Sequence, residues 1–312
     1  MISVSGLSKY FGNHPALDGV SFHIEKGEIV GFLGQNGAGK TTLMRVLTTY
    51  LLPSSGTVSL FGEDVVLNSL SARRRIGYLP ETPPLYLQMS VYEYLKFAAQ
   101  LKDVPFKQQR LQIDRVLQSC NLSDVKHRTI EELSKGFRQR VGIAQAIIND
   151  PDVLILDEPT NGLDPIQIAQ FRDLIHHLEF RGVVILSTHI LSEIEKLAQR
   201  VIILKKGKII ADQKMSELLN QPDYDKMVSI QLKTTDPLAV ETVLTQLELK
   251  DYDLSVKDGV CQLLVKISEG DVYVELLEKI HELRLPILSI KTSKRSLEDV
   301  FLGLMSKDEE KG

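Results

Sequence analysis

The chain has 312 residues, of which 25% are charged and 43% hydrophobic, and its formal net charge is -4. This length fits one large α/β domain with a smaller second one, and the acidic balance argues against nucleic acid as a partner. Cys120 and Cys261 show no zinc or disulfide spacing and no segment reaches the roughly 18 apolar residues that span a bilayer, so we expect a soluble, unexported chain.

The first structural signal is an alternating pattern near the N-terminus. Val20, Phe22 and Ile24 alternate with polar residues, which predicts a half-buried β-strand. A turn at Lys26-Gly27 then leads into the apolar run 29–33. The first domain is therefore expected to begin with these strands.

A glycine-rich stretch follows this apolar run directly. It fits the pattern G-x-x-x-x-G-K-[ST] in the required strand, loop and helix setting. Its glycines let backbone N–H groups converge on an anion, and Lys40 adds a positive charge. The Thr41 hydroxyl suits a phosphate-bound Mg2+, and the following helix N-terminus attracts phosphate. We predict that nucleotide phosphates are bound by Gly34, Gln35, Asn36, Gly37, Ala38, Gly39, Lys40, Thr41 and Thr42.

Helical periodicity replaces the strand pattern from Pro83 onward. Ser90-x-x-Glu93 is a capping box, and the apolar residues over 94–101 recur at helical spacing. We predict a helical subdomain over about residues 83–150, inserted between two strand-rich portions.

Acidic residues end the first of three later strands. The unbroken apolar runs 153–156, 183–186 and 201–204 are typical of strands buried on both faces of a sheet. The first run leads into Asp157 and Glu158, at the strand end where ligands sit in open α/β sheets. We interpret Asp157 as a Mg2+ ligand and Glu158 as the general base for a water attacking the γ-phosphate. A solvated strand end is the alternative.

The composition changes after about Gln221-Pro222, where we place a domain boundary between residues 1–221 and 222–312. The second part reads as a ferredoxin-like βαββαβ unit with a hairpin around Asp258-Gly259. We expect a dimerisation or packing module, with a small-molecule sensor as the alternative. Its predicted strands span 227–233 and 287–292, and its predicted helices span 236–247 and 271–283.

A further motif, Leu133-Ser-Lys-Gly-Phe-Arg-Gln-Arg-Val141, opens a helix before Asp157. With the glycine-rich loop, Asn161-Gly-Leu-Asp164 and Ser187-Thr-His189, it follows an order of motifs that resembles the ATP-binding subunits of ABC transporters. The resemblance covers about residues 1–215. The signature of that family reads L-S-G-G-Q, and its Leu, Ser and second Gly are matched here by Leu133, Ser134 and Gly136.

The resemblance implies that two such domains face each other head to tail. Ser134, Lys135 and Gly136 of one chain would then contact the ATP held by the other, helped by the helix N-terminus that follows. Lys135 could add a cation there or point to solvent. Taken alone, Ser134 would be a helix N-cap.

The resemblance also assigns residues around the base and the γ-phosphate. It implies that His189 contacts the γ-phosphate beside Glu158, whereas a lone His at a strand end is more often structural. It further implies that Phe11, or alternatively Tyr10, stacks on the adenine, with core packing as the other interpretation.

Two segments depart from the family pattern. The segment 76–80 leads the family into a Gln, but here position 81 is Glu, which only accepts hydrogen bonds and favours metal over bare phosphate. We therefore place Glu81 at the metal site with Thr41 and Asp157. Lys135 and Phe137 replace the Gly and Gln of the signature. These departures resemble the gliding-motility-type branch of ABC-2 exporter ATPases, and the tail 296–302 is similar to the ending of ABC-2 ATPases.

Together these patterns predict an α/β P-loop ABC-type ATP-binding domain that hydrolyses ATP with Mg2+. The resemblance implies a homodimer or a pair with another ABC ATPase, and an integral-membrane ABC-2 permease partner that holds the cytoplasmic chain at the inner face of the cell membrane. One alternative is a soluble ABC ATPase acting on nucleic acid or ribosomes, although the chain lacks a second cassette and basic arms. Another is a ligand-sensing regulator.

Overall fold

The computed structural model describes residues 1–178, 180, 182–219, 226–234, 237–249, 252–257, 259–267, 270–293, 297–298 and 301. The chain forms two compact units, Met1–Met215 and Ser216–Gly312. The predicted boundary at Gln221-Pro222 lies outside the described residues, as do Asp258 of the predicted hairpin and most of the tail 296–302.

An antiparallel sheet with the strand order β2-β1-β4-β5 opens the first unit. The alternation predicted at Val20, Phe22 and Ile24 is observed, because these side chains are buried while their polar neighbours are exposed. The strands are β1 (Ile2–Phe11), β2 (His14–Ile24), β4 (Ser55–Leu60) and β5 (Glu63–Asp64).

A second sheet of the first unit has the order β10-β9-β3-β8-β7-β6. Its strands from β9 to β6 are parallel, and β10 pairs antiparallel with β9. The three apolar runs predicted as strands are β7, β8 and β9, and every residue of β7 and β8 is buried. The bounds are β3 (Ile29–Leu33), β6 (Ile76–Leu79), β7 (Val153–Asp157), β8 (Val183–Ser187), β9 (Arg200–Lys205) and β10 (Lys208–Lys214).

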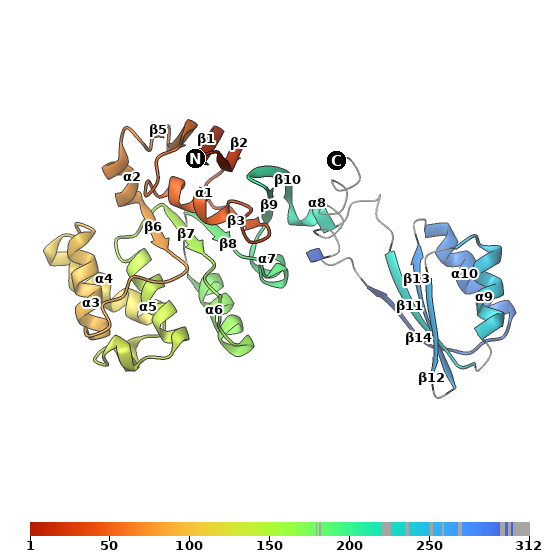
Figure 1. Cartoon of the computed structure of the whole chain (residues 1–312). Helices are drawn as coiled ribbons and strands as arrows, with labels where there is room; N and C mark the ends of the chain where they lie inside the picture. Colours follow the sequence, from red (N-terminus) through yellow and green to blue (C-terminus); the bar gives the residue numbers. More distant parts are fainter. Residues whose placement is uncertain are drawn as a thin grey trace. The chain divides into compact units, whose positions relative to one another are not determined.

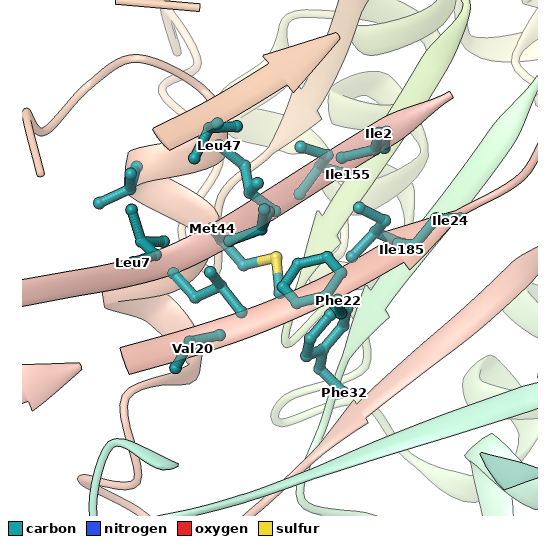
Figure 2. Packing of buried hydrophobic residues seen from close by; sticks show 14 of the residues in the cluster. Ile2, Leu7, Val20, Phe22, Ile24, Phe32, Met44, Leu47, Ile155 and Ile185 are labelled. Carbon is teal, nitrogen blue, oxygen red and sulfur yellow. The ribbon is translucent and has the colours of Figure 1, made fainter. Parts of the chain in front are cut away.

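Helix α1 (Lys40–Leu47) packs in one hydrophobic cluster with both sheets. Figure 2 shows Met44 and Leu47 of this helix among buried side chains of the two sheets. Phe22 and Phe32 meet edge to face, with ring centroids 5.3 Å apart. This packing fixes the direction in which the chain leaves β3 and enters α1, and hence the loop between them.

Three helices, α3, α4 and α5, lie beyond the β6 edge of the second sheet (Figure 1), in the stretch where a helical subdomain was predicted. The capping box also forms, with the Ser90 hydroxyl accepting from the Glu93 N–H and the Glu93 carboxylate accepting from the Ser90 N–H. Gly77 of β6 lets α5 approach closely, since a Cβ there would lie 2.4 Å from the Ala146 carbonyl oxygen. The helices of the subdomain are α3 (Val91–Leu101), α4 (Phe106–Ser119) and α5 (Lys135–Ile147), with 3-10 turns at Ser123–Val125 and Ile130–Glu132.

The remaining helices of the first unit flank its sheets. They are α2 (Ser69–Arg75), α6 (Pro165–His177) and α7 (Leu191–Leu197). Helix α8 (Met215–Leu219) begins at the last residue of this unit.

The second unit has the element order βαββαβ and a fully antiparallel sheet, β12-β13-β11-β14. Its two helices cover one face of the sheet (Figure 1) and share a separate hydrophobic core with it. Across the described residues, no helix is long and apolar enough to cross a membrane. The elements are β11 (Lys226–Leu232), α9 (Pro237–Gln246), β12 (Tyr252–Lys257), β13 (Val260–Ile267), α10 (Gly270–Glu282) and β14 (Ile287–Ser293).

Candidate functional site

The carboxyl ends of β3, β8 and β7 meet at one edge of the second sheet. Ser187 at the end of β8 pairs with Phe32 of β3 on one side and with Asp157 of β7 on the other. The glycine-rich loop follows β3, Glu158 follows β7, and His189 follows β8. Residues far apart in the sequence are thereby brought to one place, as the strand-end argument predicts.

The glycine-rich loop is tight because glycine alone fits at its ends. A Cβ on Gly34 would lie 2.5 Å from the Leu204 carbonyl oxygen. Gly39 has φ +108, and a Cβ on it would lie 2.5 Å from the Ala16 carbonyl oxygen. Helix α1 starts at the next residue, Lys40, so its N-terminal N–H groups open onto the loop.

Lys40 is buried at the mouth of this loop. Its ammonium group donates to the Gly34 carbonyl oxygen at 2.7 Å and lies 3.5 Å from Oε1 of Glu158. A full positive charge is thus held between the loop and the acidic end of β7, where an anionic phosphate would meet it.

Asp157, the last residue of β7, belongs to the same site and is almost fully buried. Its Oδ1 accepts from the Ser187 hydroxyl at 2.5 Å and from the Thr41 hydroxyl at 3.4 Å. Burial raises the pKa of Asp157, the two hydroxyls oppose this shift, and the charges of Glu158 and Glu81 add to it. Because Oδ2 is buried and has no hydrogen-bond partner among the described residues, this carboxylate has an oxygen free for another ligand.

This donor set fits Mg2+, a hard cation that binds oxygen ligands. A hydroxyl and a carboxylate with one free oxygen lie side by side at Thr41 and Asp157. Within the part of the chain that the structure describes, no group of three or more His, Cys, Asp and Glu side chains forms a dedicated metal cage. The arrangement therefore suits a cation held jointly by one or two protein oxygens, water and phosphates.

Glu158 and His189 form a close pair beside Lys40. The Nδ1 atom of His189 lies 2.7 Å from Oε2 of Glu158, at hydrogen-bond distance. Glu158 has a left-handed backbone, φ 46, which its N–H maintains by donating to the Ser187 carbonyl oxygen at 3.0 Å. The carboxylate is 9% exposed and the imidazole 46%, so the acid lies inside and the ring at the rim.

A pocket of about 580 Å3 opens over these groups. Phe11 lines it and is 51% exposed, so the interpretation that this residue packs in the core is wrong. Tyr10 is 44% exposed and does not line the pocket. The carboxylate of Glu81 accepts from the Asn161 side chain at 2.7 Å, also at the pocket. The predicted residues that line it are Phe11, Asn36, Gly37, Gly39, Lys40, Thr41, Thr42, Glu81, Glu158 and His189. Gly34, Gln35, Ala38 and Asp157 do not line it but belong to the loop and strand end beneath.

The signature residues lie elsewhere in the same unit. Ser134 and Gly136 line a second pocket, of about 270 Å3, with residues of α6, and none of Ser134, Lys135 and Gly136 lines the pocket at Lys40. Ser134 caps α5, since its hydroxyl accepts from the Phe137 N–H. The Lys135 ammonium packs over Gly162, where a Cβ would collide with it.

The sequence analysis predicted no role at the site for some of the residues found there. His14 and Asn161 line the pocket, and Ser187 holds Asp157. Ser187 could have been found, because it ends a buried strand next to Asp157. Tyr78 gave no such signal, yet burial and the charge of Asp157 raise the pKa of its hydroxyl.

Comparisons with known proteins extend these observations. A family model described as ABC transporter matches residues 17–161. The chain is 34% identical to the bacitracin transport ATP-binding protein BcrA of Bacillus licheniformis, over 98% of this chain and 97% of that protein. It is 36% identical to the ABC transporter ATP-binding protein YhcH of Bacillus subtilis strain 168, over 99% and 97% of the two chains. The dimeric structure of the bacterial ABC transporter cassette MJ0796 is similar with a TM-score of 0.62 at 26% identity, covering 69% of this chain and 99% of that one.

Asp157→Asn should stabilise the folded chain at neutral pH in the absence of divalent cations. Burial raises the folded-state pKa of Asp157, so ionisation opposes folding and stability is lost as the pH rises above the unfolded-state pKa. We expect the free energy of unfolding in urea to increase by about 1 to 2 kcal/mol at pH 7. The gain should shrink toward pH ~4, near the unfolded-state pKa. A variant that is less stable at pH 7, or a gain that does not change with pH, would contradict this account.

Proposed function

The chain belongs to the ABC transporter family as an ATP-binding and ATP-hydrolysing subunit, and we propose that it powers export through separate ABC-2-type membrane subunits. Two relatives that match it over nearly their whole length, from Bacillus licheniformis and Enterococcus faecalis, are named bacitracin transport ATP-binding proteins. The pocket that joins Lys40 and Thr41 to Glu158 and His189 is the observation that carries the ATPase assignment. A membrane permease would then hold the chain at the inner face of the cell membrane.

The ABC-2 assignment rests on the departures from the general family pattern. Glu81, Lys135 and Phe137 resemble the gliding-motility-type branch of ABC-2 ATPases. Nothing about gliding itself follows from this likeness. For the second unit we propose a ferredoxin-like packing or dimerisation module, supported by its βαββαβ order and antiparallel sheet.

ATP is proposed to bind along the pocket from Phe11 to Lys40. The Phe11 ring is exposed, with the Lys9 ammonium 5.4 Å from its centroid, and an exposed aromatic ring can stack on a base. The loop from Gly34 to Thr42 and the start of α1 present N–H groups to the phosphates. Lys40 would exchange its contact with Glu158 for the more negative phosphate, which leaves that carboxylate free to act.

Thr41, Asp157 and Glu81 are the proposed residues for Mg2+. The free Oδ2 of Asp157 and the Thr41 hydroxyl would hold the cation directly or through water. Glu81 lines the same pocket as Thr41, and its charge acts on Asp157. When bound, Mg2+ neutralises negative charge on the β- and γ-phosphates.

Glu158 is the proposed general base, with His189 as its partner. A Glu carboxylate at this position can take the proton of a water that attacks the γ-phosphate. His189 Nδ1 points at this carboxylate, which leaves Nε2 of the ring to contact the phosphate. The left-handed backbone at Glu158 turns the carboxylate back toward Lys40 and His189.

Each site is proposed to be shared by two copies of the chain. Ser134, Lys135 and Gly136 do not line the pocket of their own chain, and we assign them to the ATP of a partner. The dimeric arrangement of the similar cassette MJ0796 supports this pairing. Dimer closure would then complete the phosphate site and transmit force to the permease.

Glu158→Gln should nearly abolish ATP turnover. Because general-base catalysis is typically worth about a hundred- to ten-thousand-fold, kcat should fall within that range. The affinity for ATP should change by less than about threefold, since the amide keeps the shape of the side chain. Steady-state ATPase assays and nucleotide binding by calorimetry would measure these effects, and size-exclusion chromatography with ATP should show an accumulated dimer.

Glu195→Gln is a suitable control for this variant, because Glu195 is exposed on α7. It should leave kcat unchanged. If Glu158→Gln retains more than about a tenth of the turnover, a general-base role worth a hundredfold or more is wrong.

Glu81→Gln should weaken the response to Mg2+. The amide oxygen of Gln can still accept from Asn161, so the substitution removes mainly the charge. We expect the Mg2+ concentration for half-maximal hydrolysis to rise by about tenfold. A Mg2+ titration of ATPase activity at saturating ATP measures this shift, and an unchanged titration curve would remove Glu81 from the metal site.

A further inference from the structure

Thr160 and Glu193 form a buried hydrogen bond behind the pocket. Thr160 follows Glu158 by two residues, and Glu193 follows His189 by four. The Thr160 hydroxyl donates to Oε2 of Glu193 at 2.5 Å, and the two residues are 2% and 6% exposed. The bond therefore ties the segment after β7, which carries Glu158, to helix α7, which begins two residues after His189.

Glu193 has no ion-pair partner among the described residues. Its Oε1 is buried without a hydrogen-bond partner, and the side chain forms no ion pair with the residues described. Burial raises its pKa, and the charge of Glu158 adds to this shift. The Thr160 hydrogen bond and the charges of His189 and Arg172 oppose the shift only in part. An apolar side chain of similar length would suit such a position better for stability. A carboxylate kept there points to a role in function.

The bond is one of three contacts that restrain Glu158 and His189. On the strand side, the Glu158 N–H donates to the Ser187 carbonyl oxygen at 3.0 Å. The two side chains contact each other directly, with His189 Nδ1 2.7 Å from Oε2 of Glu158. Two residues after Glu158, the Thr160 hydroxyl donates to the carboxylate of Glu193. Because Glu158 has a left-handed backbone, it needs restraints both before and after it to keep this conformation.

We propose that Glu193 is a positioning residue, which acts through Thr160 to hold Glu158 and His189 in the geometry required for hydrolysis. This inference rests on the proposed roles of Glu158 and His189. Neither Thr160 nor Glu193 lines the pocket at Lys40. Their loss should therefore affect the catalytic step and leave ATP binding in place.

Thr160→Val and Glu193→Met remove the donor and the acceptor while keeping the side chains close in size. We expect each to lower kcat by about tenfold or more, with the KM for ATP within about twofold. Thr160→Ser and Glu193→Gln keep a donor and an acceptor, and each should retain kcat within about threefold of the unchanged protein. Because the two residues act as one unit, the Thr160→Val and Glu193→Met double variant should be no slower than the slower single variant.

Thermal unfolding separates positioning from general stability. Glu193→Met removes a buried carboxylate whose Oε1 has no partner, but it also leaves the Thr160 hydroxyl without its acceptor. Because these two effects oppose each other, its melting temperature should stay close to that of the unchanged protein. Exposed Glu195 on the same helix provides the matched control, and Glu195→Met should leave kcat unchanged.

The inference is wrong if kcat of Thr160→Val and Glu193→Met stays within about threefold, if their losses multiply in the double variant, or if kcat and melting temperature fall together. Glu158→Gln should be measured in parallel. If Glu158→Gln keeps its turnover, the proposed catalytic assignment itself fails. If Glu158→Gln loses turnover while Glu193→Met keeps it, the positioning role alone is rejected.

Discussion

The parallel pairing of β8 with both β3 and β7 is the interaction on which the ATP site depends. It places the ends of three buried strands at one edge, so that Lys40, Asp157 and His189 come together although they are far apart in the sequence. Buried apolar side chains and α1 keep these strands in register. The packed sheet thus fixes the strand ends that bring the charged side chains of the site together.

The same edge carries conformations and charges that packing alone would not favour. Asp157 has a buried oxygen without a partner among the described residues, Glu158 has a left-handed backbone, and Glu193 is a buried carboxylate. Each is unfavourable for folding by itself. Their concentration around one pocket is the pattern expected where function has been kept at the expense of stability.

Much of this site follows from local sequence patterns. The glycine-rich loop could be predicted from its motif, and Asp157 and Glu158 could be predicted from their position at the end of an apolar strand. The bond between Thr160 and Glu193 was not, since it joins two segments that lack a common motif.

The side-chain contacts and exposure of a predicted residue also could not be predicted from the sequence. A Phe at the end of a strand can pack inward or face solvent, and the hairpin from β1 to β2 leaves Phe11 exposed. The position of Lys135 over Gly162 depends on how α5 meets the loop before α6. Such contacts come from the packing of distant elements, which periodicity does not encode.

The central claim is that each ATP site is shared between two copies of the chain. The most direct test mixes two variants that are inactive alone, Lys40→Ala in the loop and Ser134→Arg in the signature. In a shared site, a mixed dimer has one site with both defects and one intact site. Because half of the dimers are mixed at equal concentrations, the account predicts recovery of about a quarter of the unchanged ATPase activity. A mixture no more active than the two variants measured separately would contradict it.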